Sequence, residues 1–286
     1  MSIHLDPTKK HDFIWLFDCI NGNPNGDPDA DNAPRMDLQT GHGLVSDACL
    51  KRKIRNYITL TTDERIFVSE GAILNDAIDE AIAAQGLEDK LDKTKKRLTD
   101  AKDVAEARNW MCENFYDIRM FGAVLSTGKN AGQVRGAVQL GFGESLDQVL
   151  PMNLSITRCA AADEKEGKDN KTMGRKNIIP YGLYKTYGFI SPQFTRQTGV
   201  TSEDLAHFWQ ALVKCFEMDR SSARGLMATQ GVWIFSHDSN LGNYPTHKLF
   251  DLLKIESLAE YPRHFKDYQV NMSPELPPGI SLTYLS

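Results

Sequence analysis

The sequence predicts an α+β fold: a ferredoxin-like core in the order strand, helix, strand, strand, helix, strand (βαββαβ), extended by insertions. Three observations lead to this prediction. Short apolar stretches of strand length recur along the chain, and stretches with apolar residues at helical spacing lie between them. In addition, a chain of 286 residues is long enough to bury a sizeable core, and its hydrophobic share of 41% is ordinary for a soluble globular protein. We expect a single domain over residues 1–286, with insertions at residues 21–45, 61–119 and 160–180.

The first strand and the first helix are predicted on either side of a long polar loop. Residues 12–20 alternate aromatic and aliphatic side chains, which predicts a buried strand. Residues 21–45 are rich in Pro, Gly, Asn and Asp, which predicts an irregular loop. Ser46 then begins a helix as its N-cap. The apolar stripe of that helix consists of Leu50, Ile54, Tyr57 and Ile58.

The rest of the chain supplies the remaining core elements and two insertions. Residues 61–119 are rich in Ala, Leu, Ile and mixed charges, which predicts a helical insertion with solvated faces. Residues 160–180 form a polar excursion, and Thr201 or Ser202 begins the second core helix as its N-cap. Further strands are predicted at residues 133–140, 152–159, 181–190 and 231–235.

Composition indicates a cytoplasmic protein and leaves room for a nucleic-acid partner. No apolar stretch approaches the ~20 residues that a membrane helix requires, and the N-terminus lacks the pattern of a secretory signal. The five cysteines lack paired spacing, which argues against a zinc site or a disulfide framework. The net charge is −5, but residues 61–119 hold the whole excess, with 14 acidic against 9 basic side chains. A basic surface can therefore lie elsewhere on the molecule.

The first basic segment lies on the helix that follows Ser46. At 100° per residue, Lys51, Arg52 and Arg55 fall on the side opposite the apolar stripe, and Lys53 lies at the edge. Residues 48–60 contain no acidic side chain. Three cations on one exposed face suit successive phosphates of a nucleic-acid strand, and a merely solubilising face is the alternative interpretation.

The second basic segment is the polar excursion. Its cations are Lys168, Lys171, Arg175 and Lys176. Met173 stands among them beside a glycine. This pattern is typical of an apolar wedge that presses between bases while its flanks hold phosphates, and a flexible surface loop is the alternative.

The third basic segment is the glycine-spaced stretch 125–136. Lys129, Gln133 and Arg135 lie there between glycines whose backbone N–H groups can cradle a phosphate. The spacing is not that of a P-loop, so nucleotide hydrolysis has no support.

The loop 21–45 offers oxygen ligands, and its spacing partly resembles that of a calcium loop. Counted from Asn21, position 12 is Asn32 where a calcium loop has a bidentate Glu, and Pro24 and Pro28 interrupt the loop. The alternative is a turn-rich loop whose Asn and Asp side chains bond their own backbone. No motif for a catalytic triad or zinc hydrolase occurs, and no cofactor is indicated. The neighbouring pair His237-Asp238 is expected to start a loop rather than to form a catalytic dyad.

Several segments together resemble one family. Residues 17–31, Gly41 to Val45, Leu50 to Tyr57, Asp117 to Leu125 and Gly132 to Gly136 are similar, in this order, to the Cas-seven backbone subunit of type I-C CRISPR surveillance complexes (Cascade). The resemblance implies a modified RNA-recognition-motif (RRM) palm with a helical finger-side insertion and a thumb-like loop. It also implies that copies stack into a helical filament along the guide RNA.

The resemblance also implies partners and site residues. The partners would be the CRISPR guide RNA, target DNA through the guide, further copies of the chain, and the guide-end-capping, large and small Cascade subunits, with no membrane. Guide phosphates would contact Lys51, Arg52, Arg55, Lys129, Gln133 and Arg135. The thumb would lie around Met173 with Lys171, Arg175 and Lys176. No catalytic residue, metal or cofactor is implied. The alternative function is a metal-dependent ribonuclease that uses Asp27, Asp29 and Asp31, because relatives in type III systems cut RNA with a loop aspartate.

Overall fold

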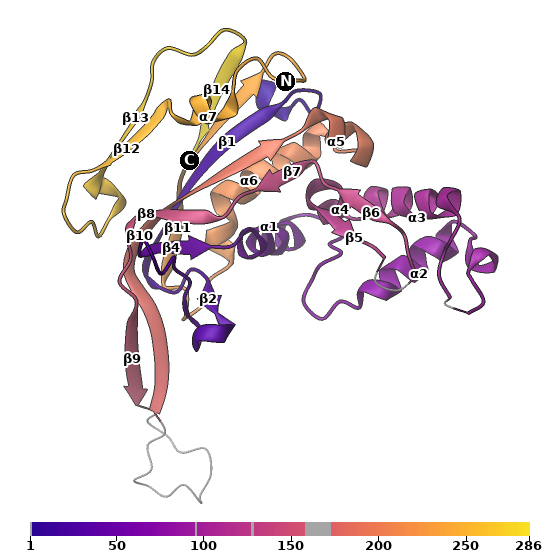
Figure 1. Cartoon of the computed structure of the whole chain (residues 1–286), viewed down its shortest axis with the longest axis horizontal. Coiled ribbons are helices and arrows are strands. Elements are labelled where there is room, and N and C mark those ends of the chain that lie inside the picture. Colours follow the sequence, from indigo (N-terminus) through magenta and orange to yellow (C-terminus); the bar gives the residue numbers. More distant parts are fainter. Residues whose placement is uncertain (1, 95, 127–128, 158–172) are drawn as a thin grey trace, which may run out of the picture.

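An antiparallel sheet forms the centre of the molecule, with a helical lobe on one side and a long hairpin projecting from the other (Figure 1). The computed structural model describes residues 2–94, 96–126, 129–157 and 173–286. The α+β class is confirmed, since the chain forms both helices and strands and most of the strands join one main antiparallel sheet. Within the described ranges no helix is both long and apolar enough to cross a membrane.

The main sheet has the strand order β14-β11-β1-β10-β8-β4, and β7 and β9 also pair with β10. Its strands are β1 (His11–Gly22), β4 (His42–Val45), β7 (Val138–Leu140), β8 (Gly143–Gln148), β9 (Met152–Thr157), β10 (Met173–Ile190), β11 (Leu226–His237) and β14 (Ile280–Leu285). β1 lies between the two long strands β10 and β11 and is antiparallel to both. The strands predicted at 12–20, 181–190 and 231–235 are confirmed as parts of these three.

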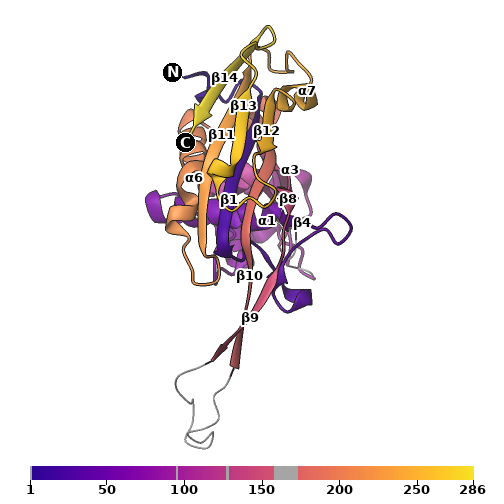
Figure 2. The same ribbon diagram turned by 90° about the vertical axis from the view of Figure 1, so that its left-hand side faces the viewer.

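The alternation of β1 separates the two faces of the sheet. Phe13, Trp15 and Phe17 pack with the helices α1 (Asp47–Thr61) and α6 (Ser202–Met218). Ile14 and Leu16 point to the opposite face. That face is covered by α7 (Thr246–Phe250) and by the hairpin of β12 (Leu253–Ser257) and β13 (Tyr268–Met272), which Figure 2 shows in front of the sheet.

Both predicted helix starts are confirmed. The Ser46 hydroxyl accepts a hydrogen bond from the N–H of Cys49, and the predicted apolar stripe of α1 is buried. Thr201 caps α6 in a reciprocal box with Asp204, so two N–H groups that would otherwise lack partners are satisfied. These caps explain why the two helices begin where the local sequence predicts.

Residues 133–140 were predicted as one strand, and this is wrong. They divide into β6 (Gln133–Arg135), which pairs with β5 (Gly122–Val124), and β7 of the main sheet. The break lies at Gly136, where a Cβ would come within 2.3 Å of the backbone of Phe121 and Gly122. Only a glycine fits this close crossing of two backbones.

The polar excursion is also shorter than predicted. Residues 173–180 are strand rather than loop, because Met173 to Ile178 pair with Thr157 to Met152 of β9. The two strands form a hairpin that extends away from the body in both views, and we call it the projecting hairpin (Figures 1 and 2). The predicted strand 152–159 is confirmed over Met152–Thr157, and residues 158–172 lie outside the described ranges.

Three helices between residues 61 and 121 build a second, smaller core. They are α2 (Leu74–Ala84), α3 (Ala101–Asn114) and α4 (Tyr116–Phe121), and α5 (Pro192–Thr198) contacts α3 and α4. Ile78, Ile82, Met111 and Ile118 are buried within this core. The short elements of the chain are β2 (Gly26–Asp27), β3 (Ala33–Pro34) and the 3-10 turns Ile3–Leu5, Pro28–Ala30, Glu88–Lys90 and Phe265–Asp267.

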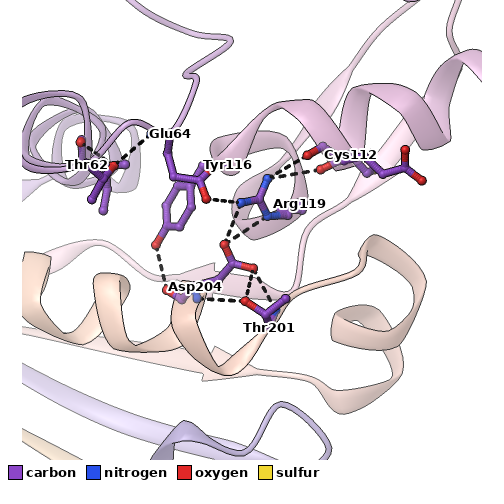
Figure 3. A network of polar contacts seen from close by, with 9 residues as sticks. Thr62, Glu64, Cys112, Tyr116, Arg119, Thr201 and Asp204 are labelled. Carbon is purple, nitrogen blue, oxygen red and sulfur yellow. Dashed lines mark hydrogen bonds and ion pairs between the residues drawn. The ribbon is translucent and has the colours of Figure 1, made fainter.

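Arg119 of α4 connects this smaller core to the main body (Figure 3). Its Nη2 lies 2.7 Å from Asp204 Oδ1 and 2.7 Å from Glu64 Oε1, and its Nη1 donates to the carbonyl of Cys112. Burial alone lowers the pKa of Arg119, but the hydrogen bonds and charge of Asp204 and then of Glu64 outweigh it, so the pKa is raised. The guanidinium therefore stays charged inside the protein.

A buried histidine makes the stability of the fold depend on pH. His11 is fully buried, with Nδ1 2.9 Å from Ser236 Oγ and Nε2 2.9 Å from the carbonyl of Asp6. Burial lowers its pKa to about 4, although the unfolded chain protonates this histidine near its ordinary value of 6.5. The unfolded state therefore binds the extra proton first, and stability present above pH 6.5 is lost as the pH falls toward 4.

We expect His11→Gln to remove part of this pH dependence. Between pH 7.5 and pH 5, the wild-type free energy of unfolding should fall by about 2 kcal/mol more than that of the variant. Urea denaturation of both proteins at the two pH values measures the difference. Parallel pH profiles for wild type and variant would contradict the assignment of this loss to His11.

Candidate nucleic-acid interface

The basic face of α1 is less exposed than predicted. The Arg52 side chain is 62% exposed, and its Nη2 lies 3.4 Å from Glu70. The Lys51 side chain is 16% exposed, with its Nζ 2.9 Å from Asp47. Arg55 was predicted on the exposed face, and this is wrong: its side chain is 13% exposed, and its Nε donates to Asp117 Oδ2 at 2.7 Å. Of the three cations, Arg52 is the one that is available to a ligand.

The partner of Arg55 explains its burial. Asp117 is itself buried and accepts hydrogen bonds from the N–H groups of Phe67 and Val68 as well as from Arg55. Arg55 therefore helps to hold the connection after α1 in place. The acids that pair with the three predicted cations of this helix are Asp47, Glu70 and Asp117, and all three lie outside residues 48–60. The absence of acids within residues 48–60 therefore wrongly indicated a free basic face.

Lys53, predicted at the edge of the helix, is buried and bound to an acid. Its Nζ lies 2.8 Å from Asp219 Oδ2, and Arg224 makes a second ion pair with the same carboxylate. Burial alone raises the pKa of Asp219, but the hydrogen bond and charge of Lys53 outweigh burial and lower it. Lys53 is a structural cation and is not available to a ligand.

Of the three residues predicted to bind phosphate in the stretch 125–136, one is bound to an acid and two are exposed. Lys129 Nζ lies 3.1 Å from Asp79 Oδ1 of α2. Gln133 and Arg135 are exposed on β6, and the Arg135 guanidinium lies over the ring of Phe194 at 4.4 Å. Within the described chain no carboxylate lies within 4 Å of Arg135. Gln133 and Arg135 are therefore available to a ligand.

The projecting hairpin carries two of the predicted thumb residues. Arg175 is exposed and Lys176 is partly exposed, on the strand that faces β9. Asn177 at the base of the hairpin donates to the carbonyl of Asp31 at 2.8 Å, which ties the hairpin to the loop 21–45. The backbone of Met173 opens β10, and Lys171 lies outside the described residues.

The prediction of one irregular loop over residues 21–45 is wrong at both ends, because β1 runs to Gly22 and His42–Val45 form β4 of the main sheet. Between these strands the alternative interpretation holds, in which side chains bond backbone. Asn25 Oδ1 accepts from the N–H of Ser46, and Asn23 Nδ2 donates to the carbonyl of Asn32. Asp27 accepts from the N–H of Asp29 and pairs with Arg35 at 3.3 Å. Among the residues that the structure describes, no three His, Cys, Asp or Glu side chains are grouped as a metal would require.

His237 finds a partner other than its sequence neighbour. It ends β11 in the interior, where its Nε2 lies 3.0 Å from Asp12 Oδ2 and its Nδ1 accepts from the N–H of Asn243. The expectation that the pair His237-Asp238 starts a loop is therefore wrong for the histidine. Cys19, Cys49, Cys112 and Cys215 are free, as their spacing predicts, and Cys159 lies outside the described ranges.

Sequence reasoning did not identify Arg108 as a candidate, although it lies beside Gln133 and Arg135 at one cavity. Arg108 belongs to α3, in the segment that was predicted to be a helical insertion with solvated faces. It is 27 residues from Arg135 in sequence (135 − 108), and no local pattern links the two. Only the folding of α3 against the β5–β6 hairpin brings them together.

A match to one family model covers most of the chain. Residues 9–273 match the family described as CRISPR-associated protein Cas7. A protein of that description from Haloferax volcanii is 25% identical over 297 residues, which cover 92% of this chain and 81% of that protein. A chain of a solved CRISPR RNA-guided surveillance complex, described as pre-nicking, superposes with a TM-score of 0.52 at 15% identity. That match covers 79% of this chain and 78% of the other, and it shows a shared fold. Because the family match spans most of the sequence, the chain belongs to the Cas7 family of CRISPR-associated proteins.

Proposed function

We propose that the chain is a non-catalytic CRISPR RNA-binding backbone subunit, and that copies of it assemble along the guide RNA and present it for pairing with target DNA. Membership of the Cas7 family supports a role in a CRISPR complex, and the solved structure with a similar fold belongs to an RNA-guided surveillance complex. In that setting the partners are the guide RNA, target DNA through the guide, further copies of the chain and the other Cascade subunits of a type I-C system.

The observation that carries the proposal is the projecting hairpin with its cations. In the described part of the chain, no carboxylate lies within 4 Å of Arg175 or Lys176, whereas every cation of α1 has a carboxylate within that distance. A two-stranded hairpin is marginal in water by itself, and β9 exposes Leu154 and Ile156. An extended, cationic, partly apolar element of this kind suits a strand of nucleic acid, whose phosphates it would neutralise.

The sheet supports an RRM-like palm. With β1 at its centre between β10 and β11, and with β7 and β8 beyond β10, the main sheet has the order expected of a split βαβ core. The helices α1 and α6 cover one face, as that core requires. In this proposal the helices α2 and α3 form the finger side, and the projecting hairpin with residues 158–172 forms the thumb.

The proposed RNA contacts follow from which side chains are available. They are Arg52 on α1, Gln133 and Arg135 on β6, and Arg175 and Lys176 on β10, with Lys171 and Met173 assigned to the thumb by sequence alone. Lys51 and Lys129 would first have to exchange an acidic partner for a phosphate. Arg55 is left out because Asp117 holds its guanidinium.

Salt dependence of RNA binding tests the proposal. The dissociation constant for a fluorescent single-stranded RNA, measured by anisotropy at several salt concentrations, should rise steeply with salt. We expect a log–log slope of about 0.7 for each phosphate contacted, and similar affinity for unrelated sequences. Binding that does not respond to salt, or no binding at all, would reject a phosphate-contacting role.

A further inference from the structure

A cavity of about 420 Å³ lies where the turn of the β12–β13 hairpin meets β8 and β10. This volume is within the range of small-ligand sites. The cavity is on the face of the sheet opposite α1 and α6, the face that the hairpin covers in Figure 2. Among the described residues, none of those proposed above to contact RNA lines it.

Three tyrosines line this cavity. Tyr181 of β10 and Tyr268 of β13 are buried, and their ring centroids lie 6.3 Å apart. Tyr261, in the turn between β12 and β13, is 72% exposed and is therefore available to a ligand. The faces of aromatic rings carry partial negative charge and attract organic cations.

The hydroxyl groups of the two buried tyrosines already donate to carboxylates. Tyr268 Oη lies 2.5 Å from Asp147 Oδ2, and Tyr181 Oη lies 3.3 Å from Oδ2 of the buried Asp18. Burial and then these acidic neighbours raise the pKa of both tyrosines, so both hydroxyl groups keep their protons. Their oxygens can still accept a hydrogen bond. The polar groups around the cavity therefore favour a ligand that donates hydrogen bonds.

The carboxylates that line the cavity have no cation beside them. Asp147 is partly buried and Glu260 is exposed, and within the described chain no basic side chain lies within 4 Å of either. By contrast, the partly buried Asp219 is paired with Lys53. Arg263 also lines the cavity, so its lining carries two negative charges and one positive charge. A carboxylate that is partly removed from water is stabilised by an added cation.

We infer that this cavity binds an alkylammonium or alkylguanidinium group, with Asp147 and Glu260 as its charged partners and the tyrosines as its aromatic wall. The group can belong to a free polyamine or to a Lys or Arg side chain of another protein, since the two share this chemistry. The inference goes beyond the proposed function and does not depend on RNA binding.

Spermidine binding to the full-length protein, freed of RNA by nuclease treatment, tests the inference. In isothermal titration calorimetry at constant ionic strength, we expect Asp147→Asn to weaken binding about tenfold. Glu260→Gln and Tyr261→Ala should each weaken it about threefold. Both of these side chains are exposed, so these two variants test the site even if Asp147→Asn does not fold.

Glu256→Gln is the matched control. Glu256 is an exposed acid of β12 in the same hairpin, and it does not line the cavity. This variant removes the same charge as Glu260→Gln and should bind spermidine like the wild type. If the two variants bound spermidine equally, the inference would be overturned.

Arg263→Ala distinguishes a cation site from an anion site. It removes the positive charge from the lining of the cavity, so spermidine should bind about threefold more tightly. The hydrogen bond from the backbone N–H of Arg263 to Asp267 does not involve the replaced side chain. Weaker spermidine binding by this variant contradicts a cation site.

Two further probes identify the carrier of the cationic group. N-acetyl-arginine amide represents a protein side chain, and N-acetyl-glutamine amide is its neutral control. Binding of spermidine alone supports a free polyamine, and binding of the arginine compound supports a basic side chain. If neither cation binds, or if the glutamine compound binds equally well, the inference is wrong. Because RNA is absent from these titrations, such a failure leaves the proposed function standing, and a failure of RNA binding leaves this inference standing.

Discussion

Replacing Arg119 with methionine is expected to lower the free energy of unfolding by about 3–5 kcal/mol, because it leaves buried acids without their cation. Asp204 is buried and receives two hydrogen bonds from the guanidinium, at 3.1 Å and 2.7 Å. Glu64 and the carbonyl groups of Cys112 and Glu113 lose donors at the same time. Methionine has a similar length but cannot donate a hydrogen bond, so the cost of the buried charge remains.

Denaturant unfolding of wild type and variant measures this effect, and Arg65→Met is the matched control. Arg65 forms a bidentate pair with Glu80, but both side chains are nearly half exposed, so water screens the pair. We expect the control to lose no more than about 1 kcal/mol. If Arg119→Met cost no more than the control, Arg119 would not be the connection between the smaller core and the main body.

The second large effect concerns RNA. The triple variant Arg52→Ala, Arg175→Ala, Lys176→Ala removes cations of α1 and the projecting hairpin that are available to a ligand. Three contacts of about 1.5 kcal/mol each would weaken RNA binding about a thousandfold. The salt slope should fall by about 2 at the same time, since each phosphate contact contributes about 0.7.

The control for this variant also removes three positive charges, but from other parts of the surface. Lys102, Lys214 and Lys254 are exposed, and none of them belongs to the proposed contacts. Replacing these three with alanine should leave both affinity and salt slope within a few fold of the wild type. Equal losses in the two triple variants would show that net charge, rather than the position of the cations, governs binding.

Local features of the fold could be predicted from the sequence because their causes are local. Ser46 and Thr201 cap helices with side chains only three residues from the N–H groups they bind. The alternation of β1 reflects two faces that are both covered, so every residue from Phe13 to Phe17 is buried. The caps and the apolar run of β1 can be recognised within a few neighbouring residues, although remote elements provide the cover.

The state of the charged residues could not be predicted, because their partners are remote in sequence. Arg55 looks free on a helical wheel, yet its partner Asp117 is 62 residues away. Lys53 is bound to an acid 166 residues away. The strand at residues 174–177 could not be predicted either, because this part of the projecting hairpin is exposed or partly exposed and its sequence, Gly-Arg-Lys-Asn, shows no apolar alternation.

The most direct test of the central claim is the ultraviolet absorbance ratio at 260 and 280 nm of the protein purified after co-expression with a CRISPR array. We predict a nucleic-acid-like ratio for the wild type, guide transcripts in the RNA extracted from it, and a protein-like ratio for the variant with Arg52, Arg175 and Lys176 replaced. A protein-like ratio for the wild type, with no guide transcript in the extract, would contradict the claim that this chain binds guide RNA.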